Sequence, residues 1–337
     1  MKVCVIGNGG REHALAWRLS ISPSVTKVYA IPGSVAMSDC AELVGIDWQQ
    51  SDHLIRFLKD NHVDLVVVGP EAPLVAGLAD ALNVAGIPVF GPSKAAAQLE
   101  GSKVFAKDLM KKYNIPTAAY GVFHKVDEAK EFIAQTGAPI VVKADGLAAG
   151  KGVVVAMTVE EANAAVEDML SGNRFGEAGS TVVIEEFMEG EEASLLAFVD
   201  GKTVVPMIAS QDGDKGPNTG GMGTYAPAPV LTDTLRDEAM KTILEPMVAA
   251  IQKENMPYVG CLYAGLMITP QGPKVVEFNA RFGDPETQVV LPLLDSDLGQ
   301  IMMACATGNL TADMVKWKDS SAACVILASK GYPETSS

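Results

Sequence analysis

The chain has 337 residues, of which 48% are hydrophobic and 20% are charged, and its formal net charge is −15 at pH 7. This length suffices for two or three domains with cores of their own. General nucleic-acid-binding proteins are usually basic, so the charge argues against that class. Any anionic substrate must be held by local Lys or Arg side chains against an unfavourable overall field.

The chain shows no sign of membrane insertion or secretion. No apolar run approaches the length of a membrane span, and the N-terminus leads straight into a predicted strand rather than a signal peptide. We therefore expect a cytoplasmic protein, acting as a monomer, with no nucleic-acid or membrane partner. The cysteines are scattered without metal-ligand spacing and are expected to be buried, reduced thiols: Cys4, Cys40, Cys261, Cys305 and Cys324.

The first hundred residues alternate between short strands and helices, which predicts an open α/β domain. Gly9, Gly10 and Arg11 follow the strand 3–6 and open a helix, an arrangement that places N–H groups where phosphate can bind. The alternative is an ordinary turn with a solvated Arg11. Glu12 stands where a dinucleotide fingerprint needs its third glycine, so a hydride-transfer enzyme is a weak alternative. Further strands are predicted at 27–31, 64–68 and 88–90, and a helix at 54–58.

Glu71 lies in a predicted turn, 69–73, that follows the strand 64–68. Open α/β sheets bind ligands at the carboxyl ends of their strands, so Glu71 could accept hydrogen bonds from sugar hydroxyls. A solvated loop acid fits the same pattern. Ser102 can cap a helix over 103–112, and this capped start marks a boundary between domains.

A glycine loop lies between two predicted strands, 140–142 and 153–155. Gly146, Gly150 and Gly152 would let backbone N–H groups approach an anion, and Lys143 and Lys151 flank them. The arrangement suits a polyphosphate but is no Walker A motif, because the glycine spacing is one residue short and a strand follows. A flexible hairpin with solvated lysines is the alternative.

The chain around this loop alternates between strands and helices. Helices are predicted at 127–135 and 159–170, the second covering the small sheet that carries the loop. The strand 181–187 ends in Glu185, Glu186 and Phe187, whose backbone could pair with an adenine edge, and the strand 192–199 begins at Glu192. The run 210–223 is rich in glycine and reads as a linker or a substrate-embracing loop. Later elements are predicted at 204–209, 231–253, 263–268 and 325–328.

A row of polar residues marks the strand from 274 onward. With a period of two, Glu277, Asn279 and Arg281 share one face, while Val276 and Phe278 face a core. Carboxylate and amide oxygens suit Mg²⁺, and a guanidinium can clamp a carboxylate or phosphate. A solvent-facing edge strand would show the same alternation.

Together these motifs resemble the ATP-grasp superfamily and, within it, the phosphoribosylamine–glycine ligase family. The matching segments span almost the whole chain and include 7–13, 69–74, 143–152, 183–187, 216–223 and 277–288. The resemblance implies an α/β protein: an N-terminal open parallel-sheet domain, then an ATP-grasp fold with a small lid and a larger α+β sheet. The implied domains are 1–100 for phosphoribosylamine, 101–120 with 190–325 for the central sheet, 121–189 for the lid, and 326–337 as the start of an otherwise absent C-terminal domain.

The resemblance also implies roles for individual residues. Lys143 and Arg281 would neutralise charge during catalysis, and Glu277 and Asn279 would hold Mg²⁺, with Mn²⁺ as a possible substitute. The implied ATP contacts are Lys103, Lys143, Gly146, Gly150, Glu185, Glu186, Phe187 and Glu192. The implied substrate contacts are Gly9, Gly10, Arg11, Glu71, Asn218, Thr219, Gly220, Gly221 and Arg281.

The activity implied is ATP-dependent ligation of glycine to 5-phosphoribosylamine through glycyl phosphate, in purine biosynthesis. The chain departs from the family pattern at 32–35, lacks the His-Lys-Arg segment that normally follows 210–212, and ends at Ser337. Another ATP-grasp ligase or carboxylase and a non-catalytic nucleotide-binding protein are the alternatives.

Overall fold

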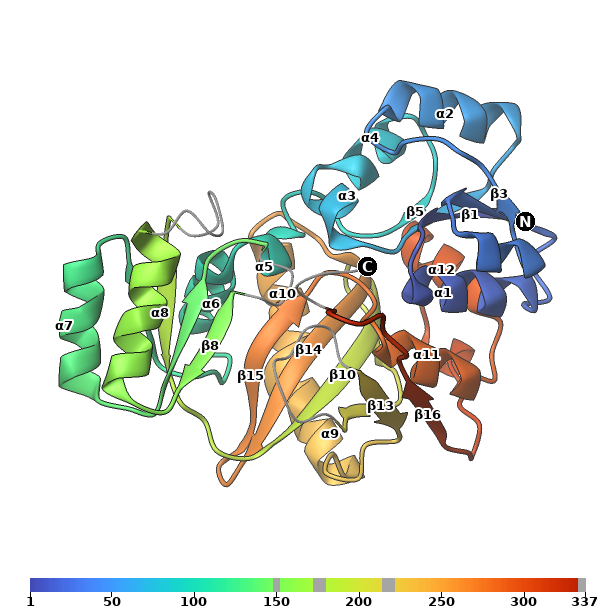
Figure 1. Ribbon diagram of the computed structural model, residues 1–337. Coiled ribbons are helices and arrows are strands. Elements are labelled where there is room, and N and C mark those ends of the chain that lie inside the picture. Colours follow the sequence, from blue (N-terminus) through green and yellow to red (C-terminus); the bar gives the residue numbers. More distant parts are fainter. Residues whose placement is uncertain (148–151, 172–179, 214–221, 333–337) are drawn as a thin grey trace.

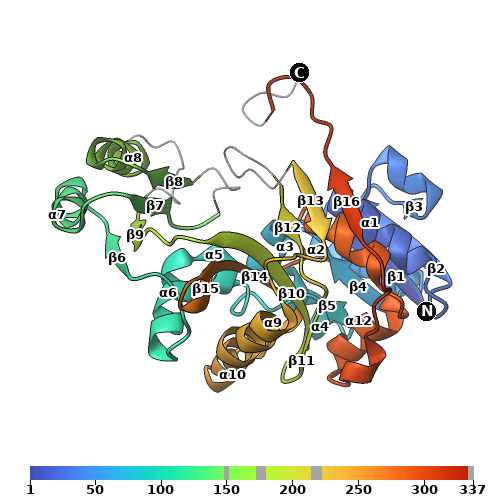
Figure 2. The same ribbon diagram turned by 90° about the horizontal axis from the view of Figure 1, so that it is seen from below.

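A computed structural model describes residues 1–147, 152–171, 180–213 and 222–332. The chain is arranged as a small helix-covered sheet, a long central sheet and an N-terminal α/β region, which follow one another across the molecule (Figures 1 and 2). The mixed α/β architecture predicted from the sequence is confirmed.

The N-terminal region is built on a parallel sheet with the strand order β3-β2-β1-β4-β5. Its strands are β1 (Lys2–Gly7), β2 (Lys27–Pro32), β3 (Glu42–Leu43), β4 (Leu65–Val68) and β5 (Val89–Phe90). The helical segments are α1 (Gly10–Ser20), η1 (Val35–Asp39), α2 (Ser51–Asp60), α3 (Glu71–Val75), α4 (Leu78–Val84) and α5 (Gln98–Gly101). The predicted turn 69–73 therefore passes straight into α3, with Glu71 as its first residue, where an acid suits the helix dipole.

Alternate residues of these parallel strands enter two different cores. Cys4 and Ile6 of β1 face α2 and α4, whereas Val3 and Val5 face α1. This second face is also covered by residues far along the chain, among them Leu298 in helix α12 (Leu298–Thr307). A parallel sheet is stable when both faces are covered, and here the later part of the chain supplies part of that cover.

The central sheet has the antiparallel order β11-β10-β14-β15. Its strands are β10 (Glu191–Asp200), β11 (Val204–Pro206), β14 (Val259–Thr269) and β15 (Gly272–Asn279). The segments that cover it or follow it are α6 (Lys103–Lys112), α9 (Asp233–Ala239), η3 (Met240–Leu244), α10 (Glu245–Lys253), α11 (Glu286–Val290), η4 (Leu291–Leu293), α12 and η5 (Ala312–Met314). Both cores of the N-terminal sheet continue into this sheet, which joins the two regions through their interiors.

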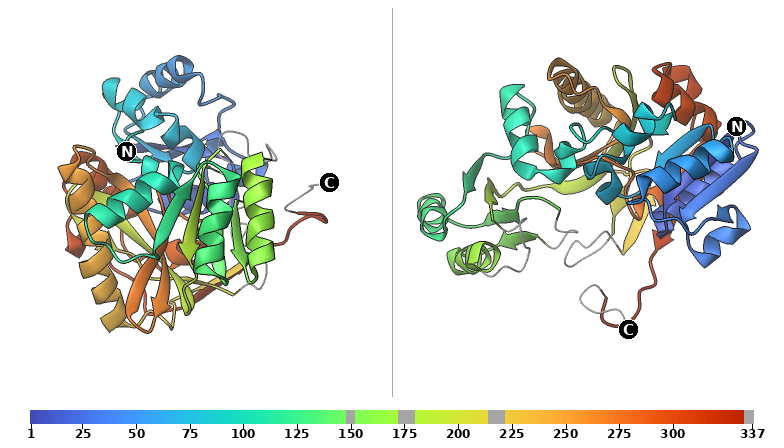
Figure 3. Two further views of the ribbon diagram at one scale, coloured as in Figure 1. Left: turned by 90° about the vertical axis from the view of Figure 1, so that its left-hand side faces the viewer. Right: turned by 90° about the horizontal axis from the view of Figure 1, so that it is seen from above.

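The small sheet forms a separate layer with its own core. It has the antiparallel order β6-β9-β7-β8, from β6 (Tyr120–Phe123), β7 (Ile140–Ala144), β8 (Val153–Ala156) and β9 (Val182–Glu186). Helices α7 (Val126–Thr136) and α8 (Val159–Ser171) lie side by side over one face (Figure 3). Ile140 and Val142 pack beneath them, so the neighbours Val141 and Lys143 point to the opposite face. We call residues 120–186 the small-sheet layer.

Several predicted elements and one predicted core residue differ from the structure. The predicted helix 231–253 is divided by the π-helical segment η3 between α9 and α10. The last strand, β16 (Ala322–Val325), ends where the prediction 325–328 began, because its pairing with β13 (Gly223–Ala226) fixes its position. β12 (Gln211–Asp212) completes that sheet. Val276 is not a core residue, because a β-bulge opposite Gly265 and Leu266 puts Val275 into the core instead.

The cysteines are free thiols, and three of them, Cys4, Cys261 and Cys305, are buried as expected. Cys40, which follows η1, and Cys324, in the edge strand β16, are only half-buried. Of the helices in the described residues, none is both long and apolar enough to cross a membrane.

Candidate active site

Lys143, which the sequence places beside the glycine loop, is buried where the small-sheet layer meets the central sheet. Its ammonium lies 2.5 Å from one carboxylate oxygen of Glu185, while Lys107 of α6 lies 2.6 Å from the other. Glu185 is therefore shared by two cations. Lys107 also donates to the hydroxyl of Thr117 and the carbonyl of Ala118. Burial lowers the pKa of Lys107, and the charge of Glu185 opposes that effect.

The β-bulge in β15 gives Lys143 its second partner. Val276 has no opposite residue in the strand pair, because it is the extra residue of the bulge. The Lys143 ammonium donates to the Val276 carbonyl at 3.1 Å. A cation from the small-sheet layer is thereby held directly beside Glu277, the first predicted metal ligand.

Lys103 lies at the capped start of α6, as predicted. The Ser102 hydroxyl accepts from the Phe105 N–H at 3.1 Å, which confirms the predicted cap. Asp145 accepts from the Lys103 backbone N–H at 2.6 Å, and the Lys103 ammonium donates to the Gly146 carbonyl at 2.9 Å. These bonds hold the start of the glycine loop against α6. Burial lowers the pKa of Lys103, while the charge of Glu277 opposes the shift and that of Lys143 adds to it.

Glu277 and Asn279 lie on one face of β15, opposite the core residue Phe278. Among the described residues, their side-chain oxygens accept no hydrogen bond and form no ion pair, although Asn279 is only 8% exposed. Uncommitted carboxylate and amide oxygens suit a hard divalent cation that completes its shell with water and phosphate. No group of three or more His, Cys, Asp or Glu ligands occurs in the described ranges, so any metal here relies on few protein ligands.

Glu192 belongs to the same electrostatic neighbourhood. Desolvation raises the pKa of its carboxyl, the charge of Glu277 raises it further, and Lys143 opposes both. The structure thus brings together five residues predicted separately from the sequence: Lys103, Lys143, Glu185, Glu192 and Glu277. Glu185 and Glu186 are paired within the sheet, so Phe187 is the first predicted adenine contact beyond the strand.

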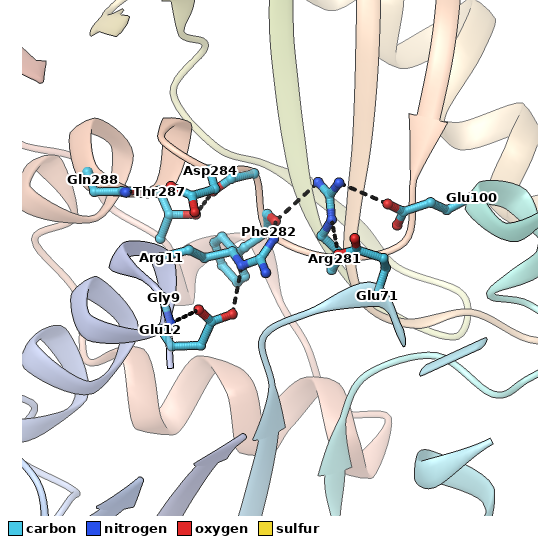
Figure 4. Close-up of polar contacts among 11 residues, drawn as sticks. Gly9, Arg11, Glu12, Glu71, Glu100, Arg281, Phe282, Asp284, Thr287 and Gln288 are labelled. Carbon is cyan, nitrogen blue, oxygen red and sulfur yellow. Dashed lines mark hydrogen bonds and ion pairs between the residues drawn. The ribbon is translucent and has the colours of Figure 1, made fainter. Parts of the chain in front are cut away.

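Arg281 lies past the end of β15, buried between two carboxylates from the N-terminal region (Figure 4). One terminal nitrogen lies 2.8 Å from Glu100, and Nε lies 3.4 Å from Glu71. Burial alone would lower the pKa of Arg281, but Glu100 and Glu71 raise it above its usual value. Burial also acts on Glu71, yet Arg281, its own backbone N–H and Arg11 hold the Glu71 pKa below normal.

The turn before α1 is occupied by the chain's own carboxylate. Glu12 accepts from the Gly9 N–H at 2.9 Å and pairs with Arg11 at 2.9 Å (Figure 4). A Cβ atom at Gly7 or Gly69 would stand within 2.4 Å of this side chain, so both glycines leave room for Glu12. Arg11 is therefore buried and paired rather than solvated, and it also donates to the Phe282 carbonyl at 3.3 Å.

The same turn lies against the loop that follows Arg281. A Cβ atom at Gly10 would meet the Gln288 amide nitrogen at 3.1 Å, and one at Gly9 would lie 3.9 Å from Asp284. Gln288 in turn donates to Asp284 at 2.7 Å (Figure 4). The predicted contacts Gly9, Gly10, Arg11, Glu71 and Arg281 therefore line one region between the N-terminal and central sheets. Gly150, Asn218, Thr219, Gly220 and Gly221 lie outside the described residues.

Several polar residues near these groups were not identified from the sequence. Lys107 and Glu100 are paired with predicted residues, and a buried chain runs from Ser194 through Tyr263 to Glu286, with distances of 2.7 and 2.8 Å. Tyr263 pairs with Asn279 across the strands, so this chain borders the predicted metal site. Ser194 lies two residues after Glu192 on β10, so the two side chains share one face of that strand.

Comparison with known proteins identifies the family. The model of the phosphoribosylglycinamide synthetase N domain matches residues 1–100, and the model of the ATP-grasp domain matches residues 101–287. A protein of Agrobacterium fabrum named phosphoribosylamine–glycine ligase is 54% identical over 339 residues, covering 99% of this chain and 80% of its own length. This chain belongs to the phosphoribosylglycinamide synthetase family.

Other members of the phosphoribosylglycinamide synthetase family agree in sequence and in fold. A phosphoribosylamine–glycine ligase of Halalkalibacterium halodurans is also 54% identical and covers 99% of the chain and 79% of its own length. The crystal structure of the Thermotoga maritima phosphoribosylamine–glycine ligase has a TM-score of 0.86 at 32% identity, covering 100% of this chain and 83% of that one. A biotin carboxylase from Campylobacter jejuni shares the fold alone, with a TM-score of 0.76 at 15% identity over 99% of this chain and 77% of that one.

Proposed function

We propose that this chain joins glycine to 5-phosphoribosylamine in an ATP-dependent reaction, giving glycinamide ribonucleotide, ADP and phosphate, as a step of purine biosynthesis. One observation carries the assignment within the family: Lys143 donates to the carbonyl of Val276, next to Glu277. A phosphate-binding cation and a pair of metal-ligand oxygens therefore stand together, and Arg281 follows on the same segment.

The ATP would lie between the small-sheet layer and the central sheet. Lys103 and Lys143 would contact its phosphates, with the glycine loop at Gly146 and Gly150 beside them. Phe187, together with Glu185 and Glu186, would flank the adenine, and Glu192 would accept from the ribose. Lys107 would remain paired with Glu185 when Lys143 turns toward a phosphate, so the buried carboxylate would keep one cationic partner.

Glu277 and Asn279 would hold a divalent cation, Mg²⁺ or Mn²⁺, which when bound supplies positive charge to the phosphate oxygens. Both residues offer hard oxygen atoms that no neighbouring group in the described residues has taken. The protein's own contribution is to fix these oxygens on one strand with Arg281 a short distance beyond. Such positioning, rather than a protein nucleophile, suits phosphoryl transfer.

Two steps follow from this placement. The glycine carboxylate takes the γ-phosphoryl group of ATP, which forms glycyl phosphate and releases ADP. The amine of 5-phosphoribosylamine then attacks the carbonyl carbon, loses a proton and expels phosphate. Arg281 and the loop 218–221 would hold the carboxylate and acyl phosphate, and Gly9, Gly10, Arg11 and Glu71 would hold phosphoribosylamine. Exclusion of water protects the acyl phosphate during these steps.

We also propose the domain division 1–100, 101–120 with 190–325, and 121–189, with the chain acting as a cytoplasmic monomer. The boundary near residue 100 is supported by the capped start of α6. The boundary near residue 189 is supported by the separate core of the small-sheet layer. Size-exclusion chromatography with light scattering would test the monomer.

The deciding experiment measures phosphate release with Mg-ATP, phosphoribosylamine and glycine, and omits each in turn. Release that needs all three is expected. If phosphate is released with another acceptor in place of glycine, the family assignment stands but glycine is not the substrate.

Glu277→Ala should abolish metal-dependent ATP use while the melting temperature stays near that of the wild type, because Glu277 is exposed and makes no hydrogen bond or ion pair with the described residues. Glu131→Ala, also an exposed acid but located on α7, outside the site described above, provides the control. Full activity of Glu277→Ala would remove the metal assignment.

A further inference from the structure

Glu100 has no role in the assignment above, yet both of its carboxylate oxygens are engaged at the candidate site. One oxygen lies 2.8 Å from a terminal nitrogen of Arg281, and the other accepts from the Ala280 backbone N–H at 2.8 Å. Glu100 lies in the short helix α5 (Gln98–Gly101), and its two partners lie 180 and 181 positions further along the chain. Its side chain is only 7% exposed, and it points toward Arg281 (Figure 4).

These two bonds act on one short stretch of backbone. β15 ends at Asn279, and Ala280 is the first residue after the strand. The Glu100 carboxylate therefore fixes the peptide that joins the predicted metal ligand Asn279 to Arg281. Removing one partner of a buried charge pair leaves the other uncompensated, which would allow Arg281 to turn toward another acid.

The other carboxylate beside Arg281 behaves differently. Glu71 lies 3.4 Å from Nε without making a hydrogen bond, and its side chain is 30% exposed. The Arg281 Nε is buried, and no acceptor among the described residues takes its hydrogen bond. Arg281 thus has one terminal nitrogen paired with Glu100, while the other donates to the Phe282 carbonyl at 3.4 Å. Its Nε faces Glu71 and is the donor left without a hydrogen bond among the described residues.

We propose that Glu100 is a positioning residue for the ligation reaction: it orients Arg281 toward the glycine carboxylate and sets the Asn279–Arg281 backbone. The proposal rests on the proposed function, in which Arg281 faces glycine. Glu100 itself touches no substrate. Glu71, with its longer and more exposed contact, is the partner that a bound anion can replace.

The test compares Glu100→Gln with Glu100→Asp. Gln keeps the size and an acceptor for the Ala280 N–H, but its amide cannot accept from Arg281 in the same arrangement. We expect Glu100→Gln to raise the KM for glycine about tenfold or more and to lower kcat. Its affinity for ATP should change less than about twofold, and Glu100→Asp should recover part of the loss.

Two controls separate positioning from general destabilisation. Glu254→Gln removes a surface acid paired with Lys112 and Tyr113 and should leave all these constants unchanged. Arg281→Ala should abolish the further effect of Glu100→Gln in the double variant, because Glu100 acts through Arg281.

Three results would overturn the proposal: a wild-type KM for glycine in Glu100→Gln, an equal loss of ATP affinity, or full additivity with Arg281→Ala. If Glu100→Gln does not fold, Glu100→Asp decides by the same constants. If the wild-type enzyme does not use glycine, the proposed function itself is wrong. That result is distinct from the three above, because it concerns the substrate and not the effect of Glu100 on Arg281.

Discussion

At the scale of single residues, the candidate site is organised by acids that each hold two groups. Glu185 lies between Lys107 and Lys143, Glu100 between Arg281 and the Ala280 N–H, and Glu12 between Arg11 and the Gly9 N–H. A buried acid with two partners has its desolvation offset by more than one contact. One partner can then be drawn toward a substrate without leaving the acid alone.

Lys103 should set an alkaline limit on the use of ATP. Burial lowers the pKa of its ammonium, so the charge is lost at a lower pH than in exposed lysines. We expect kcat/KM for ATP to fall as the pH rises through this lowered pKa. Lys103→Arg stays charged and should move the fall to higher pH. An unchanged pH profile in Lys103→Arg would show that another group is responsible.

Candidate site residues could be predicted where their neighbours in the sequence form a recognisable pattern. Glu277, Asn279 and Arg281 alternate along a strand, and Lys143 follows a β-branched run beside glycines. Glu100 and Lys107 could not be predicted, because a lone acid near a helix end and a lysine on a helix look like ordinary solvated residues. Their importance depends on partners 181 and 78 positions away, which only the folded chain brings close.

At the scale of elements, the bulge in β15 and the end of that strand determine where the candidate site residues lie. The carbonyl of Val276, the extra residue of the bulge, accepts from Lys143. β15 stops at Asn279, and Arg281 beyond it lies against acids of the N-terminal region. The period of two predicted the faces of Glu277 and Asn279 correctly. It placed Val276 in the core wrongly, because a single inserted residue leaves no mark in a run of valines.

The residue that caps α12 also binds the segment that follows α1. Asp297 caps this helix by accepting from the Gln300 N–H at 3.1 Å, and it also accepts from the Ser24 N–H and hydroxyl at 2.8 and 2.7 Å. Asp297→Ala should therefore destabilise the protein by about 2 to 3 kcal/mol, more than a cap alone.

Thr232→Ala provides the matched control for this prediction. Thr232 caps α9 through one bond, to the Leu235 N–H at 3.3 Å, and its loss should cost about 1 kcal/mol. Urea unfolding of both variants measures the difference. Equal losses would mean that the bonds to Ser24 contribute nothing.

At the scale of the whole molecule, the net charge opposes the substrates that the site is built to hold. With a formal charge of −15, the protein repels ATP at a distance, while Lys103, Lys143 and Arg281 attract anions only at close range. The field of the whole chain is screened by salt more readily than these buried contacts are.

Added salt should therefore help ATP to associate. We expect kcat/KM for ATP to rise between about 20 and 150 mM monovalent salt, by less than about threefold, as the long-range repulsion is screened. Glycine carries no net charge, so its KM should change little and serves as the internal reference. A steady fall in kcat/KM for ATP over this range would show that attraction by the local cations, and not repulsion by the net charge, controls the association of ATP.

The shared cores of the N-terminal and central sheets have a consequence for how the chain is made. Val3, Val5 and Leu15 leave the ribosome early, but Leu298 and Ile301, which pack in the same core, are translated almost 300 residues later. At a synthesis rate of about 5–20 residues per second, roughly 15 to 60 s pass before the residues that cover this face of the first sheet are made. During synthesis the nascent chain therefore presents an apolar surface to chaperones, and the last helix of the core completes the first sheet.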